Sequence, residues 1–448
     1  GITHLLLIYL FYNIIFKLKK NVKGPVPFPL LGNFVRMATM QQSLGQLVKT
    51  LYSRYPEERY VGFHCGLTPM LLIRDPELIK QVMISDFNTF INRGLKTNDA
   101  GFNHNLFVAE GEVWRTIRNK LTPNFTMTKL KQITPEINMC VSKLIECIEE
   151  AVEQEQNVDI MHFAKEFSLD AISSNVFGLK LNFYRTNNSN TTYLKKIIQA
   201  SVSPPIFFRL WYFTELLIPG IHKVFHKLDL VADIRNFFIK LMDVSMDFRE
   251  SYGLKRNDVL ETLVKLRKEG KIILPKEIPT AELEMNDNTI AGLLFNIYTA
   301  GFETLASTFS FMLHELSLHP EIQDKIYEEI CSTINKHNGE LNYDSIKEMC
   351  YLQSALNETT RKHTLVEWVL RKSVADYTFP GTQLCIPSGT LIVVSTSGLH
   401  NDSKYFDNPN KFEPSNCSKE SLNKKHQCSL SILVSNGFSS GEAEVIIR

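Results

Sequence analysis

Trp114 and Arg118 have side-chain types and a spacing suited to binding an acidic ligand. They lie in the run Trp114-Arg-Thr-Ile-Arg118, four residues apart, so on a helix they share one face. A guanidinium offers a carboxylate two parallel donors, and an indole covers a flat apolar surface. An ordinary amphipathic helix gives the same pattern, so this run alone does not define a site.

A second group of residues occurs within a helical pattern that spans about 288 to 318, where the sequence reads Ala300-Gly301-Phe302-Glu303-Thr304. A glycine and a hydroxyl in mid-helix lower helix propensity and favour a bend. By itself, the run also fits a small-residue packing notch beside a solvated glutamate.

A third pattern is Glu358-Thr-Thr-Arg361, in which opposite charges three residues apart meet on one helix face and can pair. This pattern is common by chance. Its weight comes from its context, because it follows His319-Pro-Glu-Ile-Gln-Asp-Lys-Ile and Tyr351-Leu-Gln-Ser-Ala-Leu-Asn in a fixed order.

The elements that carry these residues are mainly helical. Apolar residues at three- and four-residue spacing predict helices over most of 110–375. Residues 60–73 alternate as in a short hairpin, Asp75-Pro-Glu77 opens a helix, and Thr390–Ser395 has strand character. We expect one compact, mainly α domain with a small β-sheet near each end, an α+β class, rather than two domains.

Composition narrows the functional class. The net charge of +1 gives no reason to expect nucleic acid as a partner. The eight cysteines include no Cys-x-x-Cys pair and no zinc spacing. Cys140 and Cys147 are seven residues apart on an expected helix, and we interpret them as buried thiols in a reducing compartment rather than as a disulfide.

The N-terminal region has the pattern of a membrane anchor. Residues 2–16 are almost wholly apolar and the basic stretch Lys17-Leu-Lys-Lys20 follows, which predicts an anchor over 1–20 with the C-terminal side in the cytosol. The alternative is a buried core helix. Three prolines within 24–32 predict a stiff hinge over 21–32. The main domain then spans 33–426 and an out-of-pattern tail spans 427–448.

Taken in order, the three motifs resemble those of the cytochrome P450 family, and the closest similarity is to its insect-type, microsomal, xenobiotic-oxidising branch. Further matches follow in register at Arg371, at Pro380-Gly-Thr and at Gly398–Pro414. Earlier matches occur at Tyr60-Val-Gly-Phe, Arg74–Lys80 and Arg256-Asn-Asp-Val-Leu260. The resemblance covers roughly 1–426, with four ordered motifs.

The resemblance implies a haem-dependent monooxygenase that oxidises lipophilic small molecules with dioxygen. It implies a flavin reductase as electron donor and a place on the endoplasmic-reticulum membrane with the body in the cytosol. Trp114, Arg118 and Arg371 would hold the haem propionates. Ala300 and Gly301 would form the oxygen groove, Thr304 would hydrogen-bond dioxygen, Glu303 would relay protons, and Glu358 and Arg361 would form a structural pair.

The pattern departs from the family after Pro414. The family has an acid and then an arginine that joins the Glu/Arg pair, whereas this chain has Ser415 and Asn416, so we expect a looser loop. The family's Phe-Gly-x-Gly-x-Arg-x-Cys-x-Gly loop, whose thiolate binds the iron, does not follow His426. By counting, its cysteine position falls at Ser440, so the sequence assigns no metal ligand. Cys417 and Cys428 lack the neighbouring glycines of that loop.

The abrupt loss of register after His426 is typical of a reading-frame shift or misassembly, and the tail is interpreted as truncated or garbled. Three readings follow from the sequence. The first is a monooxygenase. The second is a catalytically dead, haem-poor truncated or frameshifted relative, because the axial cysteine is absent. The third is an unrelated helical protein at a membrane surface, which four ordered motifs disfavour.

Overall fold

The computed structural model describes residues 22–95, 104–155, 157–179, 232–256, 258–275 and 282–418. Packing of the backbone separates the chain into two compact units. Among described residues, unit 1 holds 22–95 and 354–418, and unit 2 holds 104–353 with the gaps just given. The boundary near the C-terminal end falls within helix α15, Cys350–Lys362.

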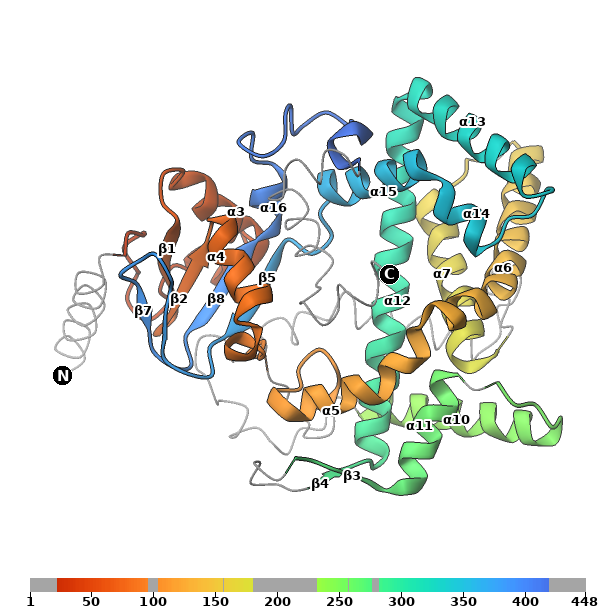
Figure 1. The fold of residues 1–448 in the computed structure, drawn as a ribbon, viewed down its shortest axis with the longest axis horizontal. Helices are drawn as coiled ribbons and strands as arrows, with labels where there is room; N and C mark the ends of the chain where they lie inside the picture. Colours follow the sequence, from red (N-terminus) through yellow and green to blue (C-terminus); the bar gives the residue numbers. More distant parts are fainter. Residues whose placement is uncertain are drawn as a thin grey trace. The chain divides into compact units, whose positions relative to one another are not determined.

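Unit 1 is built on a four-stranded sheet in the order β1-β2-β8-β5 (Figure 1). Strands β1 (Tyr60–Cys65) and β2 (Thr68–Ile73) form an antiparallel hairpin, in which Gly66 takes a positive φ at the turn. Strand β8 (Leu391–Ser395) pairs parallel to β2, and β5 (Trp368–Lys372) pairs antiparallel to β8. The hairpin and the C-terminal strand were predicted, but the expectation of separate sheets near each end is wrong: strands from both ends share one sheet.

The helices of unit 1 follow local sequence signals. They are α2 (Val35–Ala38), α3 (Leu44–Arg54), α4 (Pro76–Lys80) and α16 (Thr396–His400). Ser43 and Gln46 form a capping box at the start of α3, and Asp75 caps α4 with Pro76 in the first turn. Unit 1 also contains the short helical segments η1 (Gln81–Ser85), η2 (Phe87–Phe90) and η6 (Pro414–Cys417). Strands β6 (Tyr377–Thr378) and β7 (Cys385–Ile386) form a small antiparallel sheet.

Unit 2 is a helical bundle around α12, Asp287–Leu318, which Asn286 caps and which matches the predicted helix. Helix α7 (Ile160–Phe177) packs along α12, as do α10 (Ala232–Ser251) and, less extensively, α11 (Val259–Glu269) and α13 (Pro320–Lys336). The remaining elements are α5 (Gly111–Leu121), η4 (Thr122–Phe125), α6 (Met127–Glu153), α14 (Tyr343–Glu348), β3 (Lys271–Ile273) and β4 (Glu282–Glu284).

Each unit has its own apolar core. In unit 1 the core joins Phe63 and Val393 of the sheet to Leu51 of α3, and all three are buried. In unit 2 the core joins α7, α10 and α12 through Phe177, Phe238 and Tyr298, whose rings contact one another. We expected one compact unit because no linker interrupts the sequence. Unit 1 is assembled from both ends of the chain, so no single linker could mark the boundary. The mainly helical class with small sheets is as predicted.

Candidate functional site

The predicted site residues divide between the two units, and each group is described within its own unit. Unit 2 carries Trp114 and Arg118 on α5 and the run Ala300–Thr304 on α12. Unit 1 carries Arg371 on β5 and the pair Glu358 and Arg361 on α15. The predicted anchor and the tail with Ser440 and Cys428 lie outside the described residues.

Helix α5 positions Trp114 and Arg118. Its buried face is formed by Ile117 and Leu121, which join the core of unit 2. Trp114 and Arg118 are both half-buried and lie one turn apart. Arg115, also half-buried, pairs instead with Glu112 at 3.0 Å in an i,i+3 contact. Arg115 therefore has an acidic partner on its own helix.

The run on α12 presents different residues to different faces. Gly301 faces α7: a Cβ there would lie 2.6 Å from Cδ1 of Ile172, so the glycine allows the two helices to approach closely. Ala300 and Thr304, one turn apart, are exposed, and Glu303 is half-buried. The packing notch at Gly301 and an exposed face at Ala300 and Thr304 are therefore both present on one helix.

Hydroxyl side chains bond repeatedly to the backbone of α12. The Oγ1 of Thr304 donates to the carbonyl of Ala300 at 2.6 Å, and the Oγ1 of Thr308 donates to the carbonyl of Thr304 at 2.7 Å. These bonds place the hydroxyl proton on the helix and leave the lone pairs of the Thr304 oxygen directed outward as acceptors. Six residues before Thr304, the phenol of Tyr298 bonds Ser173 at 2.7 Å, and burial raises the pKa of Tyr298, so that phenol stays neutral.

Arg371 is a buried cation in unit 1. It lies opposite Ile392 of β8, is 3% exposed, and donates through Nη1 to the carbonyl of Leu370 at 3.0 Å. A guanidinium removed from water is stabilised by an anionic partner. The strand therefore holds a buried cation that suits a carboxylate ligand.

Glu358 and Arg361 meet as the sequence suggested. Both side chains are 0% exposed, and two bonds of 2.7 and 2.8 Å join the guanidinium to the carboxylate. Arg361 also donates to the carbonyls of His400 and Lys411, at 2.7 and 3.2 Å, and lies 5.0 Å from the ring of Phe406. The pair therefore ties the loop after α16 to α15.

The expected gap at Asn416 is partly filled. The backbone N–H of Glu413, the amide of Asn416 and the thiol of Cys417 all reach the carboxylate of Glu358, at 3.0, 3.4 and 3.3 Å. Sequence reasoning missed Glu413 and Cys417. Their only signal was the register of Phe412-Glu-Pro414, which brings the chain back to α15.

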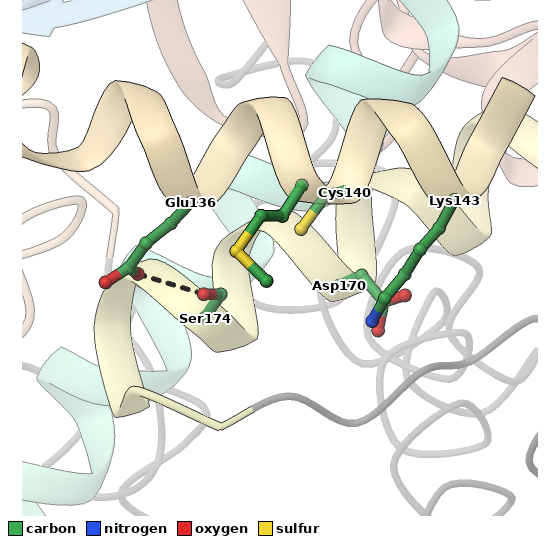
Figure 2. Close-up of a pocket in the computed structure, with 6 residues that line it drawn as sticks. Glu136, Cys140, Lys143, Asp170 and Ser174 are labelled. Carbon is green, nitrogen blue, oxygen red and sulfur yellow. Dashed lines mark hydrogen bonds between the residues drawn. The ribbon is translucent and has the colours of Figure 1, made fainter.

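A small hollow lies between α6 and α7 (Figure 2), lined by Glu136, Met139, Cys140, Lys143, Asp170 and Ser174. Ser174 donates to Glu136 at 3.0 Å, and Glu136 also pairs with Arg256 at 2.7 Å. None of the predicted site residues lines it, and the ion pair indicates a structural role. Cys140 is buried and Cys147 half-buried on α6, and neither forms a disulfide, as predicted.

Within the described ranges, no group of three or more His, Cys, Asp or Glu side chains is arranged to hold a metal ion. No helix in the same ranges combines the length and apolar character needed to cross a membrane.

The chain belongs to the cytochrome P450 family. The family model described as Cytochrome P450 matches residues 22–441, which span both units. The chain is 33% identical over 411 residues to Cytochrome P450 6B2 of Helicoverpa armigera, covering 92% of this chain and 80% of the relative. It is 32% identical over 413 residues to Cytochrome P450 6B1 of Papilio polyxenes, with 92% and 81% covered. Cytochrome P450 6k1 of Blattella germanica is 30% identical over 427 residues, with 92% and 80% covered.

Membership defines the chemical class. The chain is an oxidoreductase of the haem-thiolate monooxygenase type, whose substrates are lipophilic and whose electrons come from a redox partner. Within unit 1, the buried guanidinium of Arg371 suits a haem propionate. Within unit 2, the exposed Ala300 and Thr304 leave a small-residue face on α12. The iron-ligand position, Ser440 by counting, lies outside the described residues.

Proposed function

We propose that this chain binds haem through Trp114, Arg118 and Arg371 and inserts an oxygen atom into lipophilic small molecules. Haem, when bound, supplies the oxygen activation. The two arginines neutralise and orient its carboxylates, with bidentate geometry that a lysine would not reproduce. The indole of Trp114, one turn from Arg118, adds apolar cover and an N–H donor.

Thr304 and Glu303 are proposed to take part in proton transfer on α12. The Thr304 hydroxyl is held by the Ala300 carbonyl at 2.6 Å, so its oxygen stays in one orientation and presents acceptor lone pairs outward. Glu303, half-buried beside it, carries the only carboxylate of the run and is suited to relay a proton from solvent. The exposure of Ala300 and Thr304, on a helix whose other residues are mostly buried or half-buried, is the observation that carries the proposal.

The finer partner and location are also part of the proposal. A flavin reductase is proposed as the electron donor. Residues 1–20 are proposed to anchor the chain in the endoplasmic-reticulum membrane with the body in the cytosol, on the support of an apolar run followed by basic residues. Lipophilic substrates partition into that membrane, so such an anchor would place the site near its substrates.

Replacing Thr304 tests the proposed proton role. Thr304→Ala should lower the rate of substrate oxygenation by roughly 10²-fold, the lower end of what a positioned acid–base group contributes. Thr308→Ala is the matched control, because Thr308 makes the same backbone bond one turn later. The measurement is product formed from a lipophilic probe with NADPH and a flavin reductase, in a chain that carries a Phe-Gly-x-Gly-x-Arg-x-Cys-x-Gly loop grafted after His426, because the unmodified chain has serine at the counted ligand position. Equal losses in both variants would reduce the role of Thr304 to helix geometry.

A further inference from the structure

The buried carboxylate of Glu358 needs hydrogen-bond donors from the protein. At 0% exposure it has no access to water, so each lone pair that lacks a donor costs free energy. Arg361 supplies one donor to each oxygen, and the N–H of Glu413 adds a second donor to Oε1. Oxygen Oε2 therefore depends on a second donor from elsewhere.

Cys417 supplies that donor. The 3₁₀ turn η6, Pro414–Cys417, returns the chain to α15 and places Sγ 3.3 Å from Oε2. An ionised carboxylate only accepts hydrogen bonds, so the sulfur must carry its proton and donate. Cys417 is 1% exposed, which keeps water away from the contact.

Asn416 is the weaker of the two side-chain donors. Its Nδ2 lies 3.4 Å from Oε1, at the long limit for an N–H···O bond, whose usual length is about 2.9 Å. Oε1 also already accepts from Arg361 and from the backbone of Glu413. A sulfur atom is larger than nitrogen, so a 3.3 Å separation is a close approach for a thiol.

We propose that the Cys417 thiol is the third partner of Glu358, in place of the arginine that the family carries after Pro414, and that it positions the loop of residues 405–418. Neutral donors then replace a cation, so the cluster carries no net formal charge where an arginine would add +1. The thiol engaged with Glu358 is a positioning group and not an iron ligand. The inference concerns unit 1 alone and does not depend on the substrate proposed above.

The S–H stretching band in the infrared tests the contact directly. A donating thiol absorbs at lower frequency than a free one. The full chain and its Cys417→Ser variant are compared, and their difference spectrum should contain one hydrogen-bonded S–H component. Asn416→Ala should retain that component. If the S–H component that Cys417→Ser removes lies at the frequency of non-bonded thiols, the proposal is overturned.

Thermal unfolding provides a second, independent test. Cys417→Ala should lower the midpoint by roughly 1 to 3 °C, as expected when one buried acceptor loses its donor in a chain of 448 residues. Cys417→Ser keeps a donor and should lower it less. In an Asn416→Arg background, the new guanidinium can donate to Glu358. In that background Cys417→Ala should lower the unfolding midpoint by less than half as much. Equal midpoint shifts for Cys417→Ser and Cys417→Ala would show that Cys417 only fills space. Equal shifts for Cys417→Ala with and without Asn416→Arg would show the same.

Discussion

At the scale of single residues, chemistry was easier to predict from the sequence than contacts were. The Glu358 and Arg361 pair follows from i,i+3 spacing, and the structure brings the two together. Cys417 could not be found in this way, because a lone cysteine carries no local signal and its partner lies 59 residues earlier. Only the folded path of the loop shows that the two meet.

The two arginines of α5 allow a matched test of cofactor binding. Arg118→Ala should weaken haemin binding by roughly 10-fold, because a charge-assisted bond contributes about 1.5–3 kcal/mol. Arg115→Ala should change it by less than about 2-fold, since Arg115 pairs with Glu112 on the surface. Absorbance titration with haemin, in a chain that carries the cysteine loop grafted after His426, measures both. Equal effects would remove the assigned role of Arg118.

At the scale of elements, local signals gave boundaries and distant pairing was missed. The cap at Asp75, the hairpin at 60–73 and the helix from about 288 to 318 all appear as predicted. The union of β2 with β8 was not predicted, because strand register between distant segments depends on packing of the whole unit and not on alternation within either strand.

The cap of α4 makes a pH prediction. Burial acts to raise the pKa of Asp75, but hydrogen bonds from Arg59 and from the N–H groups of Leu78 and Glu77 outweigh it, so the pKa is lowered. A lowered pKa means that the folded chain favours the carboxylate. This stabilisation is therefore complete above the unfolded value of about 4 and is lost as the pH falls through the folded value.

The variant Asp75→Asn should accordingly unfold more easily than the parent at pH 7, by up to about 1 kcal/mol, and the difference should shrink towards pH 3. Its amide oxygen can still cap the helix, so Asp75→Ala should lose about 1 kcal/mol more at every pH. Denaturant unfolding at several pH values measures both. A difference in unfolding free energy between the parent and Asp75→Asn that does not change with pH would contradict the ion-pair account.

At the scale of the whole molecule, family membership was predictable from four ordered motifs, and the family match across both units confirms it. The division into two units was not predictable, since unit 1 draws on both ends of the chain. The iron ligand stays a prediction, because the position counted to Ser440 lies outside the described residues.

The absorption spectrum tests the ligand. Thiolate ligation produces the red-shifted Soret band of the reduced, carbon-monoxide-bound family. With serine at position 440 we expect no such band from the unmodified chain. Grafting a Phe-Gly-x-Gly-x-Arg-x-Cys-x-Gly segment and its following helix after His426 should restore it. A thiolate-type band from the unmodified chain would point to Cys428, which Cys428→Ser would resolve.

Cell fractionation tests the anchor. Deleting residues 1–20 should move most of the chain from the membrane fraction to the soluble fraction, because the apolar run and Lys17–Lys20 are removed together. Replacing Lys17, Lys19 and Lys20 by glutamine should leave membrane attachment largely intact. The orientation of the chain in the membrane should then be less uniform. A truncated chain that stays with membranes as completely as the full chain would show that attachment comes from elsewhere.

The pairing of β2 with β8 also has a consequence for biosynthesis. Met70 emerges from the ribosome early, whereas its partner Leu391 emerges near the end. At roughly 5–20 residues per second, the β1–β2 hairpin waits about 15 to 60 seconds for the strand that covers its inner edge. During that interval the apolar residues Leu71 to Ile73 are left with an unpaired edge, the kind of surface that chaperones bind. Production of this chain should therefore depend on chaperone supply more than its ordinary composition suggests.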